Sequence, residues 1–302
     1  MFKQNQQLKP LSLLLSQTFF VNLSLSLFFV ASNTLFLVYF GAEALPYVYI
    51  GVAVVGSLVS YGLTLLQKRL SLSVLATFII GSFLVMTVAA RIGLQLSSGA
   101  WIPFALMIAH TLIGQLAGVA IGGQAGRLFD IREVKRLFPI VMAGRPVGFL
   151  IGGLSVTLLI SLLGIIENLF WVSVVGFGLT LLLLQVTIAS YRNRLNETPQ
   201  AGNKTPFSQQ SLRALWQQRY IRRIVAFQML SALASQLLSY LFMTQAVLQF
   251  PETEALAGFF GNMIIVLNIS STLFLMLIAG RLLNRFGVYF GLVSNATAVL
   301  AL

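Results

Sequence analysis

The sequence lacks cysteine and has one histidine and seven carboxylate residues among its 302 positions. Without cysteine the chain can form neither disulfide bonds nor thiolate metal sites. A single histidine cannot build a catalytic triad or a histidine metal site, and the carboxylates are scattered among predicted loops. We therefore expect a protein that is not an enzyme and that holds no metal or cofactor.

Charge is equally scarce. Only 9% of the residues are charged and 58% are hydrophobic, whereas about a quarter of a soluble domain is charged. The formal net charge is +12, which by itself would suggest nucleic acid as a partner. The basic residues, however, stand in short clusters between apolar runs of membrane-spanning length. We therefore expect the partner to be a lipid bilayer and not nucleic acid.

The apolar runs predict an all-α, polytopic membrane bundle with eight complete spans and part of a ninth. The first run is longer than the apolar region of a signal peptide and lacks a cleavage site, so it is read as a retained helix. The predicted spans cover residues 11–40, 47–66, 72–94, 101–123, 138–163, 169–190, 224–250 and 255–282, with the ninth beginning at 287 and running to 302.

Loop lengths predict three parts: a six-helix bundle in residues 1–190, a cytoplasmic linker in 191–223, and the start of a second six-helix bundle in 224–302. Within the linker, Leu212, Leu215 and Trp216 recur at helical spacing among arginines. This pattern is typical of an interfacial helix, and an ordinary helical linker is the alternative. The predicted ninth span breaks off at the last residue, so we expect a fragment of a twelve-span protein, or one that a soluble domain follows.

Lysine and arginine set the expected orientation, because they concentrate on the cytoplasmic side of membrane proteins. With the amino terminus in the cytoplasm, 17 of the 19 lysines and arginines fall on the inner side. The two exceptions are Arg91, at the outer end of the third span, and Arg145, inside the fifth. The expected location is therefore an inner (plasma) membrane, as in bacteria, with the amino terminus inside.

Residues 124–153 interrupt this pattern with a charged block that we interpret as a loop between the fourth and fifth spans. Glycine recurs every four residues on both sides of the block, at Gly114, Gly118 and Gly122 and at Gly144, Gly148 and Gly152. Small residues at this spacing let two membrane helices approach closely. The pattern predicts that the fourth and fifth spans pack against each other.

Polar side chains form a stripe on each of two spans, the first and the seventh. The stripes are Thr18, Asn22, Ser26 and Asn33, and Gln228, Ser231, Ser235 and Ser239. They would either line an aqueous cavity or form hydrogen bonds between helices. If there is a cavity, the substrate-binding candidates are Asn22, Asn33, Gln115, Gln228, Gln236 and Asn262.

Arg145 is a further substrate-binding candidate because it lies about 10 Å into the fifth span by the helical rise. Its guanidinium would either bind a carboxylate or phosphate group, or extend to the headgroups and pair with Asp130 or Glu133. Pro146 would open the helix beside it. His110, the single histidine, is a candidate for proton coupling, and a neutral hydrogen-bonded histidine is the alternative.

Two motifs carry a resemblance to a known family. Residues 280–287, GRLLNRFG, resemble the cytoplasmic loop motif of the major facilitator superfamily, in a chain of six spans, a linker and further spans. Residues 129–139, FDIREVKRLFP, followed by Gly144 and Gly148, look like the loop after the fourth span in nucleotide translocase-type carriers and their bacterial relatives. The resemblance implies a gating or loop role for Asp130, Arg132, Glu133, Lys135, Arg136, Arg281 and Arg285.

The resemblance and the scarcity of intramembrane charge together imply a function. We expect a secondary transporter that moves a small, anionic solute by alternating access, with Arg145 as the positive charge in its cavity. The alternative is a non-transporting membrane anchor or sensor with a transporter-like fold. Asn284 and Gln67 favour that alternative, because they stand where the loop motif has carboxylates.

Overall fold

The computed structural model describes residues 2–96, 99, 101–196 and 217–274, and within them every regular element is helical. Eight of these helices are long and apolar enough to cross a membrane. They are α1 (Phe2–Phe40), α2 (Leu45–Leu66), α3 (Leu72–Leu96), α4 (Trp101–Leu128), α5 (Ile131–Leu163), α6 (Leu169–Asn196), α8 (Arg219–Gln249) and α9 (Thr253–Phe274). The predicted all-α bundle is confirmed to this extent, and the chain is an integral membrane protein.

Some predictions lie outside the described residues. These are the ninth span, the end of the eighth, and the residues Leu212, Leu215 and Trp216 of the interfacial helix. The chain divides into two units, one made of residues 1–197 and 246–270 and the other of residues 198–245 and 271–302. The first unit holds α1 to α6 and most of α9, and the second holds most of α8.

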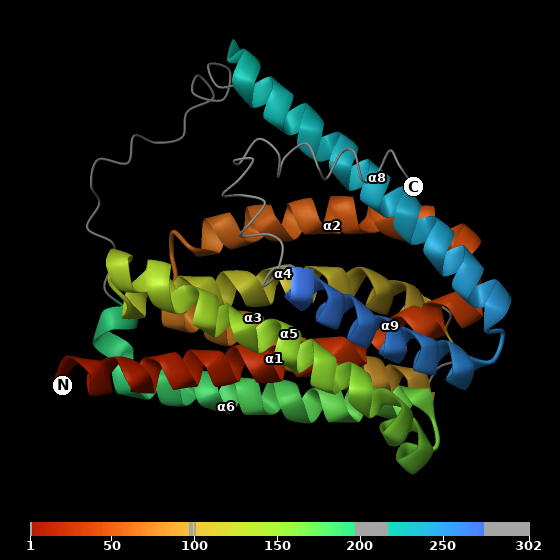
Figure 1. The fold of residues 1–302 in the computed structure, drawn as a ribbon, viewed down its shortest axis with the longest axis horizontal. Coiled ribbons are helices and arrows are strands. Elements are labelled where there is room, and N and C mark those ends of the chain that lie inside the picture. Colours follow the sequence, from red (N-terminus) through yellow and green to blue (C-terminus); the bar gives the residue numbers. More distant parts are fainter. Residues whose placement is uncertain (1, 97–98, 100, 197–216, 275–302) are drawn as a thin grey trace. The chain divides into compact units, whose positions relative to one another are not determined.

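In the first unit α1 is the central helix, and α4, α5 and α6 pack around it (Figure 1). α3 covers α4 and α6, and α2 packs against α4. Between Ser24 and Leu37 almost every side chain of α1 is buried, polar ones included. A helix whose side chains are buried around its whole circumference lies at the centre of the bundle.

The glycines of α5 explain why α1 and α5 lie so close. A methyl group added to Gly148 would stand 2.5 Å from the carbonyl oxygen of Phe19, and one added to Gly152 would stand 2.6 Å from Cβ of Ser26. The glycines of α4 behave differently, since a methyl group added to Gly118 would meet nothing within 4 Å. The prediction that the fourth and fifth spans form the close pair is therefore wrong, because the glycine face of α5 is turned to α1.

The charged block after α4 is also different from the predicted loop. α4 runs to Leu128 and α5 begins at Ile131, so only two residues connect them. The carboxylate of Glu133 accepts a hydrogen bond from the backbone N–H of Asp130 at 3.1 Å. An acidic cap residue with glutamate three positions later is the capping-box pattern, which starts a helix at this point.

Two connections between helices use glycine where the backbone needs a positive φ. Gly41 ends α1 at φ 69° before the short 3₁₀ turn η1 (Ala42–Ala44), and Gly164 ends α5 at φ 78° before η2 (Ile166–Asn168). Residues with a Cβ rarely adopt this conformation. Each glycine thus stops a long helix at the boundary where the next one must turn back.

The contact between α1 and α5 is testable with two matched exchanges. We expect Gly148→Ala to destabilise the protein by about 1–3 kcal/mol, the usual effect of overpacking a tight interface. Gly118→Ala makes the same chemical change where there is open space and serves as the control. The measurement is the temperature at which each purified variant loses its monodisperse gel-filtration peak in detergent. Equal midpoints for the two variants would contradict the packing described here.

Candidate functional site

The α2–α3 and α4–α5 connections lie at the same end of the first unit, which we call the basic end. It carries Lys68, Arg69, Arg127, Arg132 and Arg136 among the described residues. Asp130 and Glu133 form the cap of α5 there, and Lys135 lies in the second turn of the same helix. The gating candidates Arg281 and Arg285 lie outside the described residues. The gating role of the whole set stays a prediction.

Arg145 is exposed and lies in the middle of α5, which continues through Pro146 without a break. The expected opening of the helix beside Pro146 is therefore not found. Glu133 precedes Arg145 by twelve residues, which is about 18 Å along the helix, so an ion pair with the cap of α5 is excluded. Arg145 is thus a cation without that carboxylate partner inside a membrane-spanning helix.

The direction in which Arg145 lies follows from the contact of α5 with α9. Gly153 and Val156 of α5 meet Gly261 of α9 so closely that a methyl group on Gly261 would stand 3.1 Å from Cβ of Val156. Arg145 precedes Val156 by eleven residues, or about three turns, and therefore shares its helical face. Gly152, which contacts Ser26 of α1, lies seven residues from Arg145 and is equally close to it in angle, so Arg145 lies at the border between the faces of α5 that meet α1 and α9.

Two other candidates meet around Phe29 of α1. The amide of Asn33 donates to the carbonyl oxygen of Phe29 at 2.8 Å, and the ring of His110 contacts the Phe29 ring edge-on with the ring centres 5.4 Å apart. Phe260 of α9 packs against the same phenylalanine. The buried Oδ1 of Asn33 has no hydrogen-bond partner among the described residues. Phe29 is therefore the residue through which α1 meets His110 of α4 and Phe260 of α9, with Asn33 one turn further along α1.

The remaining substrate-binding candidates lie on α1, α4 and α9 in the first unit and on α8 in the second. Asn22 is buried and donates to the carbonyl oxygen of Thr18 in its own helix at 2.7 Å. Gln115 on α4 and Asn262 on α9 are exposed. Gln228 and Gln236 lie on α8 in the second unit, which is described by itself. Their contact with a solute stays a prediction.

The sequence patterns do not predict a buried network of side-chain amides that the structure contains. Gln17 of α1 donates to the hydroxyl of Thr187 on α6 at 2.8 Å and accepts from the amide of Gln124 on α4 at 3.2 Å. All three side chains are buried. Glutamine within an apolar span was the available signal, but nothing in the sequence indicates that Gln17 and Gln124 face each other. The network ties the central helix to two neighbours.

Arg91 lies near the carboxyl end of α3, where it is a buried residue. Its side chain is 5% exposed, and Nη2 donates to Oδ1 of Asn168 in η2 at 2.8 Å. Asn168 in turn donates to the carbonyl oxygen of Leu163 at the end of α5. The hydrogen-bonded guanidinium of Arg91 thus links α3 to the connection between α5 and α6, which is a structural role.

A comparison of the chain with protein-family models, curated proteins and solved structures finds no match. The class of protein therefore rests on the helices themselves. The described residues form an all-α membrane bundle, and no group of three or more histidine, cysteine or carboxylate side chains among them is arranged to hold a metal ion.

The Arg91–Asn168 contact yields a second prediction. We expect Asn168→Ala to cost about 1–3 kcal/mol of stability, because a buried guanidinium loses its acceptor. Adding Arg91→Met to that variant also removes the buried charge whose acceptor is gone. This double exchange is expected to restore part of the lost stability. Thermal midpoints in detergent measure both effects. A double variant that is less stable than Asn168→Ala alone would show that the contact is not the cause.

Proposed function

We propose that the protein is a secondary transporter that moves a small anionic solute by alternating access. It would operate in a bacterial inner membrane with its amino terminus in the cytoplasm, as a member of the major facilitator superfamily related to nucleotide translocase-type carriers. The observation that carries the proposal is Arg145, an exposed cation in the middle of a membrane-spanning helix.

An isolated cation in the hydrocarbon region costs about 2.5–3.5 kcal/mol on insertion scales, and it is retained where it has a function or a partner. The acidic cap of α5 lies too far along the helix to pair with Arg145. An anionic solute supplies the missing charge, and the planar guanidinium fork suits a carboxylate or a phosphate group. The net charge of the site therefore favours anions over cations.

The helix contacts support the alternating-access part of the proposal. Gly144 and Gly148 bring the backbones of α5 and α1 together, and Gly153 meets Gly261 where α5 touches α9. Contacts between glycine faces contain few interlocking side chains, so one helix can shift against the other without repacking a core. Small sliding movements of packed helices are one of the ways in which domains close around a ligand.

A specific observation favours the alternative, a non-transporting anchor or sensor. Thr18, Asn22 and Ser26 of the predicted polar stripe are buried, and each donates a hydrogen bond to a backbone carbonyl of α1 or α5. Polar groups satisfied in this way do not need water or a solute. In this alternative the guanidinium of Arg145 only extends along the helix to the headgroups.

Uptake by cells that express the chain separates the two functions. We expect accumulation of at least one member of a panel of radiolabelled carboxylates, phosphate esters and nucleotides. Arg145→Ala should raise its KM by about 10- to 100-fold, the range for loss of a charge-assisted hydrogen bond. Arg145→Lys keeps the charge but not the fork and should fall between.

Lys68→Gln is the matched control, because it removes an exposed cation from the end of α2 instead of from within a span. Membrane yield of each variant corrects for expression. No uptake of any solute by the wild type, with no change on Arg145→Ala, would contradict the transporter and favour the anchor. An equal loss on Lys68→Gln would show that general surface charge and not the span is responsible.

A further inference from the structure

A groove between α3 and α6 at the basic end is lined by polar and apolar side chains that have no role in the proposed function. It forms a pocket of about 700 Å³ that begins at Ser71, next to the first residue of α3, and extends along α6 from Asn196 to Gln185. Both helices belong to the first unit. The groove therefore lies entirely within the first unit.

The polar side of the pocket consists of hydrogen-bond donors. The hydroxyl of Ser73 donates to Oδ1 of Asn196, which leaves the NH₂ group of Asn196 to donate elsewhere. The amide of Gln185 donates to the hydroxyl oxygen of Thr77 at 3.2 Å, which leaves the hydroxyl hydrogen of Thr77 available. Arg192 adds a guanidinium to the same lining. These groups together offer donors to an acceptor that sits between the two helices.

Positive charge dominates the pocket. Arg192 is exposed and borders a second, adjoining pocket of about 290 Å³ that also contains Asn193 and Arg194. No carboxylate lines either pocket among the described residues. α6 leaves helical geometry at Tyr191, where φ is −133°. Because this kink lies just before Arg192, it re-aims the end of α6 at the point where the cation is placed.

The other wall of the pocket is apolar and exposed. Val74 is 51% and Phe78 is 58% exposed, although both belong to a membrane-spanning helix. Thr77 lies between them, about 8 Å from the start of α3 by the helical rise. A hydroxyl and an amide on the outside of the bundle at this depth face hydrocarbon, where unsatisfied polar groups are costly. A ligand that is polar at one end and apolar at the other matches both walls.

We propose that this pocket binds an anionic phospholipid, with the phosphate group held by Arg192, Asn196 and Thr77 and an acyl chain lying along Val74 and Phe78. Donors without acceptors and a guanidinium select a phosphate oxygen. The apolar wall distinguishes a lipid from a soluble phosphate compound. The proposal rests on the membrane class of the protein alone and holds whether or not the protein transports a solute.

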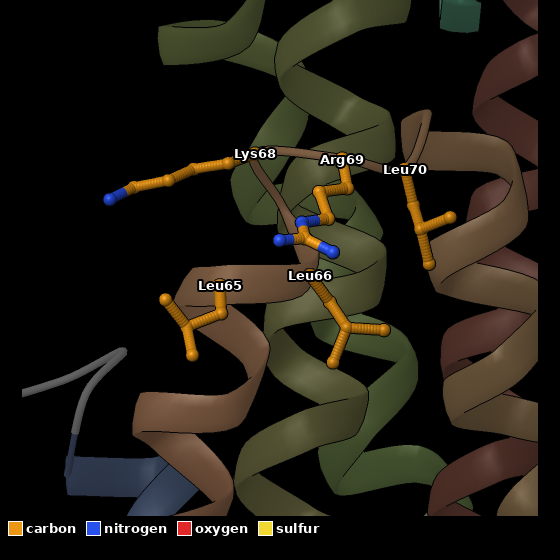
Figure 2. A pocket seen from close by; sticks show the side chains of 5 residues that line it. All are labelled: Leu65, Leu66, Lys68, Arg69 and Leu70. Atoms are coloured by element: carbon orange, nitrogen blue, oxygen red, sulfur yellow. The ribbon is translucent and has the colours of Figure 1, made fainter.

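A second basic site at the same end of the unit lacks the polar side chains that line the groove between α3 and α6. Figure 2 shows the pocket at the end of α2, where Lys68 extends away from the helix and Arg69 lies above Leu66. Its lining is otherwise leucine, with no hydroxyl or amide side chain among the described residues. Such a site attracts anionic headgroups by charge but does not orient a phosphate. Arg69 is therefore the matched control for Arg192.

The test is native mass spectrometry of the purified chain in detergent that contains increasing amounts of phosphatidylglycerol or phosphatidylcholine. We expect one phosphatidylglycerol to bind more tightly than the rest, and Arg192→Gln to weaken that binding about tenfold, as for the loss of one charge-assisted hydrogen bond. Thr77→Val should weaken it less, because it removes a neutral donor. Arg69→Gln should change it less than twofold. Thermal midpoints verify that each variant is folded.

Three results would overturn the proposal. Equal loss of binding in Arg192→Gln and Arg69→Gln would indicate general attraction by surface charge. Equal affinity for phosphatidylcholine and phosphatidylglycerol, unchanged by Arg192→Gln, would indicate that no anion is selected. Displacement of the lipid by glycerol phosphate at the same concentration would indicate a site for a soluble phosphate compound.

Discussion

The close approach of backbones around α1 is the constraint on which the first unit depends. Gly144, Gly148 and Gly152 place the backbone of α5 directly against α1, and Gly176 does the same for α6, where an added methyl group would collide with the hydroxyl of Ser24. In a bilayer, burying apolar side chains gives little driving force, since lipid is equally apolar. Van der Waals packing between close helices replaces it, and glycine permits the closest approach.

Because α1 lies at the centre, its polar side chains form hydrogen bonds with the helices around it. Ser26 donates to the carbonyl oxygen of Phe149 on α5, and Ser173 on α6 donates to the carbonyl oxygen of Ser24. Gln17 connects to both α4 and α6. Such hydrogen bonds average only about 0.6 kcal/mol each in membrane proteins. Their main effect is to fix the rotation of α1 among its neighbours, which in turn fixes which faces of α4, α5 and α6 remain open.

The faces left open carry the features of functional interest. On α5, Arg145 lies at the border between the face that meets α1 and the face that meets α9. Because α6 packs along α1 and α3, the groove between α3 and α6 opens outward at the basic end. One cation therefore lies inside a span and the other at its boundary. The proposed solute contact and the proposed lipid contact therefore lie at different positions along the helices.

Sequence by itself determined the helices, since membrane-spanning length and apolar composition are local properties of the chain. The eight predicted spans correspond to eight observed helices, although α5 begins earlier than predicted, because Asp130 and Glu133 cap a helix where the charged block suggests a loop. Sequence also placed Arg91 near the end of the third helix and Arg145 within the fifth. Only the tertiary structure decided which partners they meet: Arg91 is buried against Asn168, and α5 packs on α1 rather than on α4. A glycine pattern marks a face for close packing, but the identity of the opposing helix depends on contacts between residues more than a hundred positions apart, which no local pattern encodes.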